Sequence, residues 1–397
     1  MDSRIVQKFT LLLKVKGRLF MKRIGILTSG GDCQGLNAAI RGVCKTLYNH
    51  YKKDEIEIYG IIDGYRGLIT GEYRLMKPED FSGILTRGGT ILGTSRQPFK
   101  LMRVIDEENN VDKVAAMKAN YKKMKLDCLV ILGGNGTQKS ANMLSQEGLN
   151  VVSLPKTIDN DLWGTDMTFG FQSAVDIATQ VIDCIHTTAT SHSRVFIVEL
   201  MGHKAGWLTL YAGIAGGADV ILIPEIPYDI NKAVDKINER RAKGKEFSIV
   251  VVAEGAAPKG GEITVEGTRD NGAGVDNNKL GGVGQVVARQ LEKLTGLEAR
   301  NTTLGYMQRG GTPTAFDRVL STKYGAKAME LALNGQFGVL AVLKNGKLDS
   351  VSLEDVVGRN TKIGAVSGNT AESNLRKVTM DDDLVKTARS VGINLGD

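Results

Sequence analysis

Three aspartates follow an apolar run at residues 154–166, which read LPKTIDNDLWGTD. Asp159, Asp161 and Asp166 stand so close that their carboxylates repel one another unless a cation lies among them. Phosphoryl transfer needs Mg²⁺ on the phosphate oxygens, one carboxylate to hold that ion, and another to take the proton from the attacking hydroxyl. Residues two apart on an extended stretch share a face. We therefore expect Asp159 and Asp161 to divide these tasks, and Asp166 to cap the following helix.

Two glycine-rich turns stand between apolar runs and helix-forming segments. Residues 29–37 read SGGDCQGLN, and residues 133–137 read GGNGT. Glycine lets successive backbone N–H groups turn toward one anion, and the N-terminus of a helix adds a partial positive charge. One such loop is a weak signal. Two of them, together with the aspartate loop, indicate a phosphate-binding site.

Arginines supply the cations that a phosphate site needs. A third glycine turn, residues 87–96 (RGGTILGTSR), ends in Arg96, whose planar guanidinium suits phosphate oxygens. Arg194, Arg300 and Arg309 each stand beside a predicted strand end or a glycine turn. Taken singly, each is more often a surface ion pair than a ligand. As a set they fit a second, immobile phosphate on a substrate that also carries a reactive hydroxyl.

The elements that position these residues follow a regular order. Segments with helical periodicity, such as residues 37–49 and 171–187, separate short apolar runs, which predicts parallel α/β sheets covered on both faces. Glycines gather just past the strand ends, the edge at which open parallel sheets bind ligands. Residues 259–284, rich in Gly, Asn and Asp, are expected to form a loop without chemistry. The predicted strands are residues 23–28, 56–62, 127–132, 151–154, 194–200, 219–223 and 248–253.

Length and composition exclude several classes of protein. The 397 residues, 42% of them hydrophobic, suffice for two domains, and no window reaches the roughly 18 uninterrupted apolar residues of a membrane span. Four cysteines without CxxC spacing and four histidines give neither a disulfide scaffold nor a zinc pattern, so we expect a cytoplasmic protein.

The charge pattern does not favour a nucleic-acid partner. The net charge is +7, but residues 1–20 carry five basic side chains and one acidic one, so the remaining chain is only mildly basic. No basic run is interleaved with aromatic residues. Residues 1–20 are expected to form an N-terminal extension, and Met21, just before the first predicted strand, is a candidate natural start.

Seven motifs in order resemble those of the phosphofructokinase family, from about Met21 to about Leu333: GGDCQG, RGGTILGTSR, GGNGT, PKTIDND, SHSR, MGH and GYMQRGG. The family phosphorylates the 1-hydroxyl of fructose 6-phosphate. The resemblance implies two Rossmann-like three-layer α/β domains with mainly parallel sheets and the active site in the cleft between them. It implies a phosphoryl-donor domain at residues 21–170 plus about 309–359, and a sugar-phosphate domain at residues 171–308 plus about 360–397.

The same resemblance implies a role for each motif residue. Asp159 is the expected general base, Asp161 is the expected Mg²⁺ ligand with Asn135 near the metal, and Thr157 orients the sugar. Arg96 and the amides near Gly31 would stabilise the phosphoryl group in transfer. The expected donor side consists of Gly31, Arg96, Gly134, Asn135, Gly136, Thr137 and Lys156. The expected sugar side consists of Thr157, Asp159, Arg194, Met201, Gly202, Glu254, Arg300, Tyr306 and Arg309. Part of the arginine clamp would come across a subunit interface, which implies a homo-oligomer, dimer or tetramer.

The phosphoryl donor is either ATP or pyrophosphate in this family. Pyrophosphate users carry a second acid where this chain has Gly136, and a side chain there would fill the space of the α-phosphate. Lys156, in contrast, is typical of pyrophosphate users. The combination resembles a distinct ATP-using subgroup, so we expect ATP and keep pyrophosphate as the alternative. Asn135, where ATP users have an acid, keeps a non-catalytic nucleotide or sugar-phosphate sensor as a second alternative.

Other departures and rivals concern regulation and substrate. His203 stands where ATP users have Arg, Tyr306 where they have His, and Ile62 where they have a nucleotide-stacking Tyr. Five basic residues of this chain match positions that bind effector phosphates in allosteric members of the family. His186, however, stands where those members usually have a further Arg, so effector regulation stays open. GGNGT also resembles the loop of lipid and NAD kinases, a reading that the PKTIDND segment opposes. The matched effector positions are Arg41, Lys45, Arg74, Lys243 and Lys245.

Overall fold

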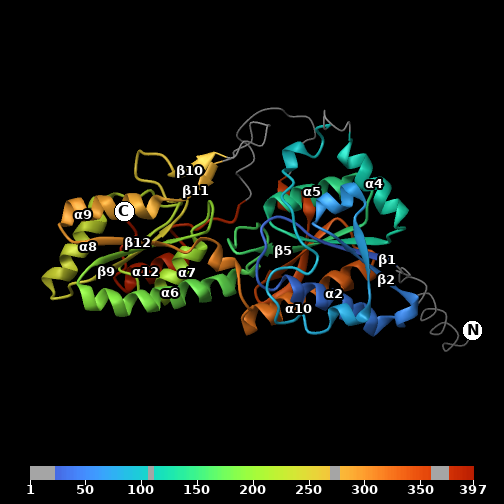
Figure 1. Ribbon diagram of the computed structural model, residues 1–397, viewed down its shortest axis with the longest axis horizontal. Coiled ribbons are helices and arrows are strands. Elements are labelled where there is room, and N and C mark those ends of the chain that lie inside the picture. Colours follow the sequence, from blue (N-terminus) through green and yellow to red (C-terminus); the bar gives the residue numbers. More distant parts are fainter. Residues whose placement is uncertain (1–22, 106–110, 269–277, 359–374) are drawn as a thin grey trace, which may run out of the picture. The chain divides into compact units, whose positions relative to one another are not determined.

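The computed structural model describes residues 23–105, 111–268, 278–358 and 375–397, and these form two compact units (Figure 1). Unit 1 takes the described residues of Met1–Thr157, Leu162–Phe169 and Ala315–Asn374. Unit 2 takes those of Ile158–Asp161, Gly170–Thr314 and Leu375–Asp397. Residues 158–161 and 309–314 thus group with unit 2, whereas we expected them in the donor domain. Residues 1–20 and Met21 lie outside the described residues.

The sheet of unit 1 is mainly parallel. Its strand order is β14-β13-β5-β4-β1-β2-β3, with β6 also pairing with β5, and the edge strands β3 and β14 run antiparallel to their neighbours. The strands are β1 (Arg23–Thr28), β2 (Glu57–Ile61), β3 (Tyr73–Met76), β4 (Cys128–Gly133), β5 (Val151–Thr157), β6 (Phe169–Gly170), β13 (Val339–Lys344) and β14 (Lys347–Ser352).

Strand β1 marks the point at which the order of this sheet reverses. The chain leaves β1 through α2 (Leu36–His50) to reach β2 on one side, and β4 pairs in parallel on the other side. Ligands of open α/β sheets bind outside the carboxyl ends of the strands at such a reversal. Both predicted glycine loops begin there, because they follow β1 and β4.

Helices cover both faces of this sheet, with α2 and α10 (Ala315–Leu333) on one face and α4 and α5 on the other (Figure 1). Glycine allows α2 and α10 to approach closely, since a Cβ on Gly325 would lie 2.4 Å from the carbonyl oxygen of Ala39. The remaining helices of unit 1 are α3 (Tyr65–Thr70), α4 (Lys113–Lys123), α5 (Asn135–Gln146), α11 (Leu353–Val357), η1 (Lys53–Glu55), η2 (Pro78–Phe81) and η3 (Phe99–Leu101).

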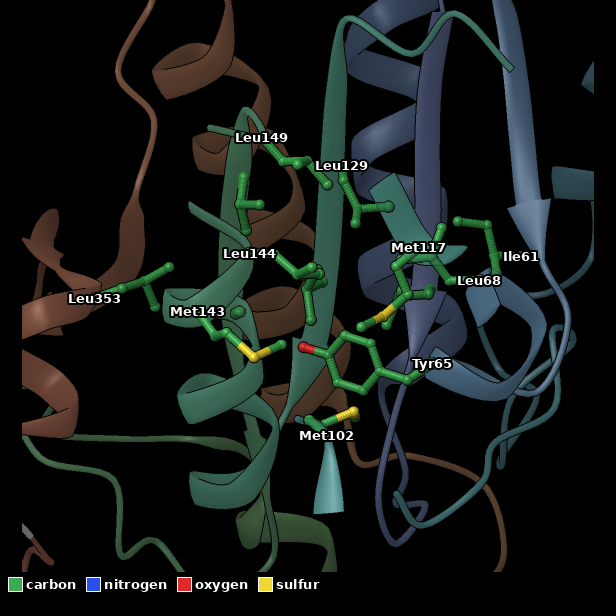
Figure 2. Packing of buried hydrophobic residues seen from close by; sticks show 14 of the residues in the cluster. Ile61, Tyr65, Leu68, Met102, Met117, Leu129, Met143, Leu144, Leu149 and Leu353 are labelled. Atoms are coloured by element: carbon green, nitrogen blue, oxygen red, sulfur yellow. The ribbon is translucent and has the colours of Figure 1, made fainter. Parts of the chain in front are cut away.

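The core of unit 1 also positions the second glycine loop. Figure 2 shows Tyr65 among buried apolar side chains that include Met117, Met143 and Leu144. Its hydroxyl donates a hydrogen bond of 2.9 Å to the carbonyl of Thr137, in the first turn of α5. Burial of each large apolar side chain stabilises the fold by about 1.5–3 kcal/mol. Packing of this core therefore fixes where α5 begins.

Unit 2 is built on a four-stranded parallel sheet in the order β12-β7-β9-β8. Its strands are β7 (Val195–Leu200), β8 (Val220–Leu222), β9 (Ser248–Ala253) and β12 (Ala299–Thr303), and a separate antiparallel pair consists of β10 (Val265–Thr268) and β11 (Asn278–Leu280). Its helices are α6 (Phe171–His192), α7 (Trp207–Ala215), α8 (Ile230–Ala242), α9 (Val283–Thr295), α12 (Asp383–Ser390) and η4 (Gly305–Arg309). No helix of the described residues is long and apolar enough to cross a membrane.

The α/β class with mainly parallel sheets is confirmed, and two local predictions were wrong. Within residues 259–284, the described residues form the paired strands β10 and β11, because antiparallel pairing joins two short segments that show no strand pattern singly. Asp166 does not cap the following helix, since the N-cap of α6 is Gly170. Instead, the Asp166 carboxylate accepts a hydrogen bond of 2.6 Å from the Asn345 N–H, in the turn between β13 and β14.

Candidate active site

The first glycine loop follows β1 and is fixed to the end of the neighbouring strand β4. The Ser29 N–H donates to the Leu132 carbonyl at 3.0 Å, and the Thr137 hydroxyl donates to the Ser29 carbonyl at 3.4 Å. Gly30 has a φ of 83°, a left-handed conformation that glycine adopts without strain. The two glycine loops of the sequence analysis therefore lie side by side at one sheet edge.

The segment that ends in Arg96 is fastened to the same loop. The Thr94 hydroxyl donates to the Gly30 carbonyl at 2.7 Å, and the Gly30 N–H donates to the Ser95 carbonyl at 3.1 Å. Asn37, buried at the start of α2, accepts a bond of 2.8 Å from the Ile91 N–H. These bonds bring Arg96, which is exposed, next to the first glycine loop.

Gly134, Asn135 and Gly136 form the start of α5, with Gly134 as its N-cap. A Cβ built on Gly136 meets no atom within 4 Å. No protein atom therefore fills the space beside this glycine. An α-phosphate would need that space. The N-terminus of a helix is a general anion-binding position, because the backbone N–H groups of a first turn point outward along the helix axis.

Lys156 is buried beside the first glycine loop. It is 3% exposed, and its ammonium group donates a hydrogen bond to the Gly31 carbonyl. A buried ammonium needs such partners because burial disfavours its charged form. At the end of β5, the Thr157 carbonyl accepts a bond of 2.8 Å from the Thr168 hydroxyl. The structure thus brings Gly31, Thr137 and Lys156 together in unit 1.

The acid loop Ile158–Asp161 belongs to unit 2, although its flanking residues belong to unit 1. Asn160 has a φ of 51°, which is uncommon for a residue with a side chain. Asp161 is 5% exposed and Asp159 is half-buried. The two carboxylates share a loop, as predicted.

Glu254 lies close to Asp159 in unit 2. It directly follows β9, and its N–H donates to the Leu200 carbonyl at 2.8 Å, so it lies beside the Met201–Gly202 turn that follows β7. The His203 N–H donates to its carboxylate at 2.9 Å. Burial raises the pKa of Glu254 to about 7; the His203 bond opposes this, and the negative charge of Asp159 adds to it. A carboxyl that titrates near neutrality beside a second acid is typical of a functional site.

Arg309 and Tyr306 follow β12, the other neighbour of β7. The Leu304 N–H donates to the Glu199 carbonyl at 3.1 Å, which places the start of η4 at the same sheet edge as Met201. The charge of Arg309 lowers the pKa of Glu254, so its guanidinium lies within electrostatic reach of that carboxyl. Tyr306 is 65% exposed. Unit 2 therefore gathers Asp159, Glu254 and Arg309, together with the Met201–Gly202 turn.

Arg194 and Arg300 lie at the opposite end of β7. Arg194 precedes the strand, and Arg300 pairs with Phe196 near its start. With a rise of about 3.3 Å per residue, this end is roughly 17 Å from the Met201 end. Both guanidiniums bind the Glu298 carboxylate, and the bond from Arg194 is the main cause that lowers its pKa. The three arginines of the predicted clamp are thus not gathered at one site of a single chain.

The residues at predicted effector positions are distributed over both units. Arg41, Lys45 and Arg74 belong to unit 1, and Lys243 and Lys245 belong to unit 2. In unit 2, the Lys243 ammonium binds Glu239, and the His186 ring shares a bond of 2.6 Å with the Gly216 carbonyl. Effector regulation stays a prediction.

The acids of the described residues fit a magnesium ion held together with phosphates. These residues contain no group of three or more His, Cys, Asp or Glu side chains that could form a protein-only metal centre. Mg²⁺ is usually bound through one or two carboxylates while substrate phosphates and water supply the other oxygens. Asp161, a buried carboxylate on a loop, is a donor of that kind.

Sequence reasoning missed one residue that contacts the acid loop. Arg376 donates its backbone N–H to the Asp161 carbonyl at 2.8 Å and a guanidinium N–H to the Asn160 carbonyl at 3.2 Å. It stands more than 200 positions downstream and outside every quoted motif. No local sequence pattern could have indicated this contact.

Comparison with known proteins gave consistent matches. The sequence model of the family described as Phosphofructokinase matches residues 23–332. The ATP-dependent 6-phosphofructokinase of Spirochaeta thermophila is 53% identical over 378 residues, which cover 95% of this chain and 98% of that protein. The ATP-dependent 6-phosphofructokinase 3 of Bacteroides thetaiotaomicron is 50% identical over 375 residues, which cover 94% of this chain and 100% of that protein.

A solved structure supports the fold. The pyrophosphate-dependent phosphofructokinase of Marinobacter aquaeolei superposes with a TM-score of 0.73 over 94% of this chain and 88% of that chain, at 22% sequence identity. A likeness at this identity bears on the fold alone. The two curated relatives with ATP in their names are far more similar in sequence.

Proposed function

The chain belongs to the phosphofructokinase family, and on this premise we propose that it is an ATP-dependent 6-phosphofructokinase. It transfers the γ-phosphoryl group of ATP to the 1-hydroxyl of fructose 6-phosphate and releases fructose 1,6-bisphosphate and ADP. The observation that carries this proposal is that Glu254, at the carboxyl edge of the unit 2 sheet, interacts electrostatically with both Asp159 and Arg309. Because ATP and sugar phosphates are intracellular metabolites, the proposed reaction takes place in the cytoplasm.

Unit 2 supplies the proposed groups for the sugar, except for Thr157, which ends strand β5 of unit 1. Asp159 accepts the proton of the 1-hydroxyl, and its half-buried position leaves it accessible to a substrate. Glu254 binds sugar hydroxyls, for which a carboxyl that can both donate and accept near neutral pH is suited. Thr157 orients the sugar, Tyr306 and the Met201–Gly202 turn contribute further contacts, and Arg309 binds the 6-phosphate.

Unit 1 supplies the proposed groups for the donor, except for Asp161, which belongs to unit 2. The backbone N–H groups of the two glycine loops bind phosphate oxygens, and Arg96 stabilises the charge on the transferring phosphoryl group. Asp161 would hold Mg²⁺, with Asn135 near it, and the bound ion supplies positive charge to the phosphate oxygens. Lys156 holds the Gly31 carbonyl and so fixes the shape of the first loop.

The open space at Gly136 supports ATP as the donor. A side chain at this position would occupy the space that the α-phosphate of ATP needs, whereas pyrophosphate has no such group. Glycine leaves that space open. The Lys156 ammonium, the feature that favoured pyrophosphate in the sequence, is engaged with the Gly31 carbonyl.

We further propose that the active enzyme is a homo-oligomer. Arg194 and Arg300 lie at the end of β7 opposite to Glu254, so one chain cannot bring them to its own sugar site through this sheet. A two-fold interface would deliver them to the neighbouring subunit's site. In mixtures of separately inactive Asp159→Ser and Arg194→Ala proteins, random dimers should recover about a quarter of the wild-type activity. Absence of any recovery after verified subunit exchange would contradict a shared site.

The proposed function is tested by comparing donors. Formation of fructose 1,6-bisphosphate from fructose 6-phosphate is measured with Mg²⁺ and either ATP or pyrophosphate, for the unmodified chain and for Gly136→Asp. We expect ATP to be the better donor, and we expect Gly136→Asp to raise the KM for ATP by tenfold or more through a steric block. A higher kcat/KM for pyrophosphate in the unmodified chain would refute ATP dependence. Tight ATP binding without turnover would favour a sensor.

A further inference from the structure

The acid loop has an unusual position in the chain. Its four residues, Ile158–Asp161, pack with unit 2, but the chain joins unit 1 immediately before and after them. In addition, Asn160 holds a left-handed conformation that a residue with a side chain adopts only when its surroundings stabilise it. Contacts from elsewhere in unit 2 must therefore hold this loop.

Arg376 makes those contacts. Its backbone N–H donates to the Asp161 carbonyl at 2.8 Å, and its guanidinium donates to the Asn160 carbonyl at 3.2 Å. The two bonds fix two consecutive carbonyls of the loop. Because the orientation of consecutive peptide planes sets the direction of the side chains between and beside them, these bonds bear directly on where Asp159 and Asp161 point.

Trp207 holds Arg376 in turn. The guanidinium carbon lies 4.1 Å from the centroid of the Trp207 ring, and the indole N–H donates to the Arg376 carbonyl at 2.9 Å. Trp207 is 4% exposed and is the first residue of α7, directly after the loop that contains Met201 and Gly202. A cation over a tryptophan face is the strongest arrangement of this kind, and it strengthens when water is excluded.

A second anchor holds the same C-terminal segment. The Val378 N–H donates to the Glu225 carboxylate at 3.0 Å, and both oxygens of that carboxylate accept from the Gly206 N–H at 3.0 Å. Val378 itself is buried. Residues 375–378 therefore connect the acid loop with the start of α7, which follows the proposed sugar-binding turn.

We propose that Arg376 is a positioning residue that aligns the Asp159–Asp161 loop with the sugar-binding loops of unit 2. The inference rests on the proposed function, in which Asp159 accepts the proton of the sugar hydroxyl. Arg376 touches neither substrate in this account and acts through the loop carbonyls. A base contributes to the transition state and little to ground-state binding. Misalignment of Asp159 therefore lowers kcat more than it changes the KM for fructose 6-phosphate.

The test compares four variants of the full chain. Arg376→Ala removes the guanidinium, Arg376→Lys keeps a cation without the planar fork, and Trp207→Phe keeps an aromatic face without the indole N–H. Lys377→Ala is the matched control, because it removes one positive charge from an exposed neighbouring position. Steady-state kinetics with ATP and fructose 6-phosphate are combined with hydrogen exchange at the amides of residues 158–161.

We expect Arg376→Ala to lower kcat about 10- to 100-fold while the KM for fructose 6-phosphate changes less than about threefold. Guanidinium ion at millimolar concentration should restore part of this loss, Arg376→Lys should be intermediate, and Lys377→Ala should match the unmodified enzyme. Hydrogen exchange at residues 158–161 should accelerate in Arg376→Ala and not in Lys377→Ala. A residue with a purely structural role would lower the stability of the protein without lowering kcat more than it changes KM.

Several results would overturn the inference. They are an unchanged kcat in Arg376→Ala, an equal loss in Lys377→Ala, or a loss carried entirely by KM. Should Arg376→Ala fail to fold, unchanged kcat in both Arg376→Lys and Trp207→Phe would reject it. If the unmodified chain does not phosphorylate fructose 6-phosphate, the proposed function fails. Unchanged exchange at residues 158–161 in Arg376→Lys would then reject the positioning role separately.

Discussion

Replacing Glu254 by Gln should change how the stability of the protein depends on pH. Glu254 is half-buried at the carboxyl edge of the unit 2 sheet, where its carboxylate accepts a hydrogen bond from the His203 N–H. Burial and, to a lesser extent, the charge of Asp159 raise the pKa of Glu254 from 4.5 to about 7, although the His203 and Gly202 backbone bonds and Arg309 oppose the shift. Glutamine has nearly the shape of the protonated acid and does not titrate.

The magnitude follows from the difference between the two pKa values. A raised pKa means that the folded chain binds the proton more tightly than the unfolded chain does between pH 4.5 and about 7. The contribution of this group to stability is therefore fully present below pH 4.5 and is lost as the pH rises to about 7. At 1.36 kcal/mol for each pKa unit, the loss is about 3 kcal/mol.

The assay is urea denaturation of both proteins at several pH values. The chain has two tryptophans, and a Trp163→Phe background leaves Trp207 in unit 2 as the fluorescent reporter. We expect equal stabilities near pH 4.5, and we expect Glu254→Gln to be more stable by about 3 kcal/mol at pH 8. Titrating groups that do not interact with Glu254 contribute equally in both proteins, so they cancel in the difference. A stability difference that stays constant between pH 4.5 and 8 would refute the raised pKa.

Two further substitutions test the base and the packing of unit 1. Asp159→Ser should cut turnover about a hundredfold or more while fructose 6-phosphate still binds, because loss of the base affects the transition state. Turnover and equilibrium sugar binding are measured on the same protein. Normal turnover would remove Asp159 from the mechanism. Gly325→Val should lower the free energy of unfolding by about 2–4 kcal/mol, because its side chain would overlap the Ala39 carbonyl, 2.4 Å from a Cβ. Calorimetric stability equal to the unmodified protein would contradict the close helix contact.

Much of the fold was predictable because its signals are local. The predicted strand at residues 23–28 coincides with β1, and the one at residues 248–253 coincides with β9. Both are continuous apolar runs, the pattern of strands covered on two faces. Strand β12 was missed because its sequence, ARNTT, is polar and its burial depends on pairing with β7. Helix α10 was not among the helical segments named from the sequence; in the structure it packs against α2.

The candidate site was predictable where one short motif contains all the residues that form a binding loop. The loops around Gly31 and Gly134 follow strands whose parallel pairing brings them to one edge. Asp166 shows the opposite case, because its partner Asn345 belongs to a turn almost 180 positions away. The separation of Arg194 and Arg300 from Arg309 likewise follows from which end of a strand each residue occupies.

The sequence by itself determined the alternation of strands and helices, the glycine turns at strand ends and the identity of the acids, because each depends on a few neighbouring residues. Only the tertiary structure decided that Arg376 and Trp207 support the acid loop, and that Glu298 lies between Arg194 and Arg300. These contacts depend on strand order and on the path of the chain between the two units. No short stretch of sequence contains that information, since the interacting groups meet only when the whole chain has folded.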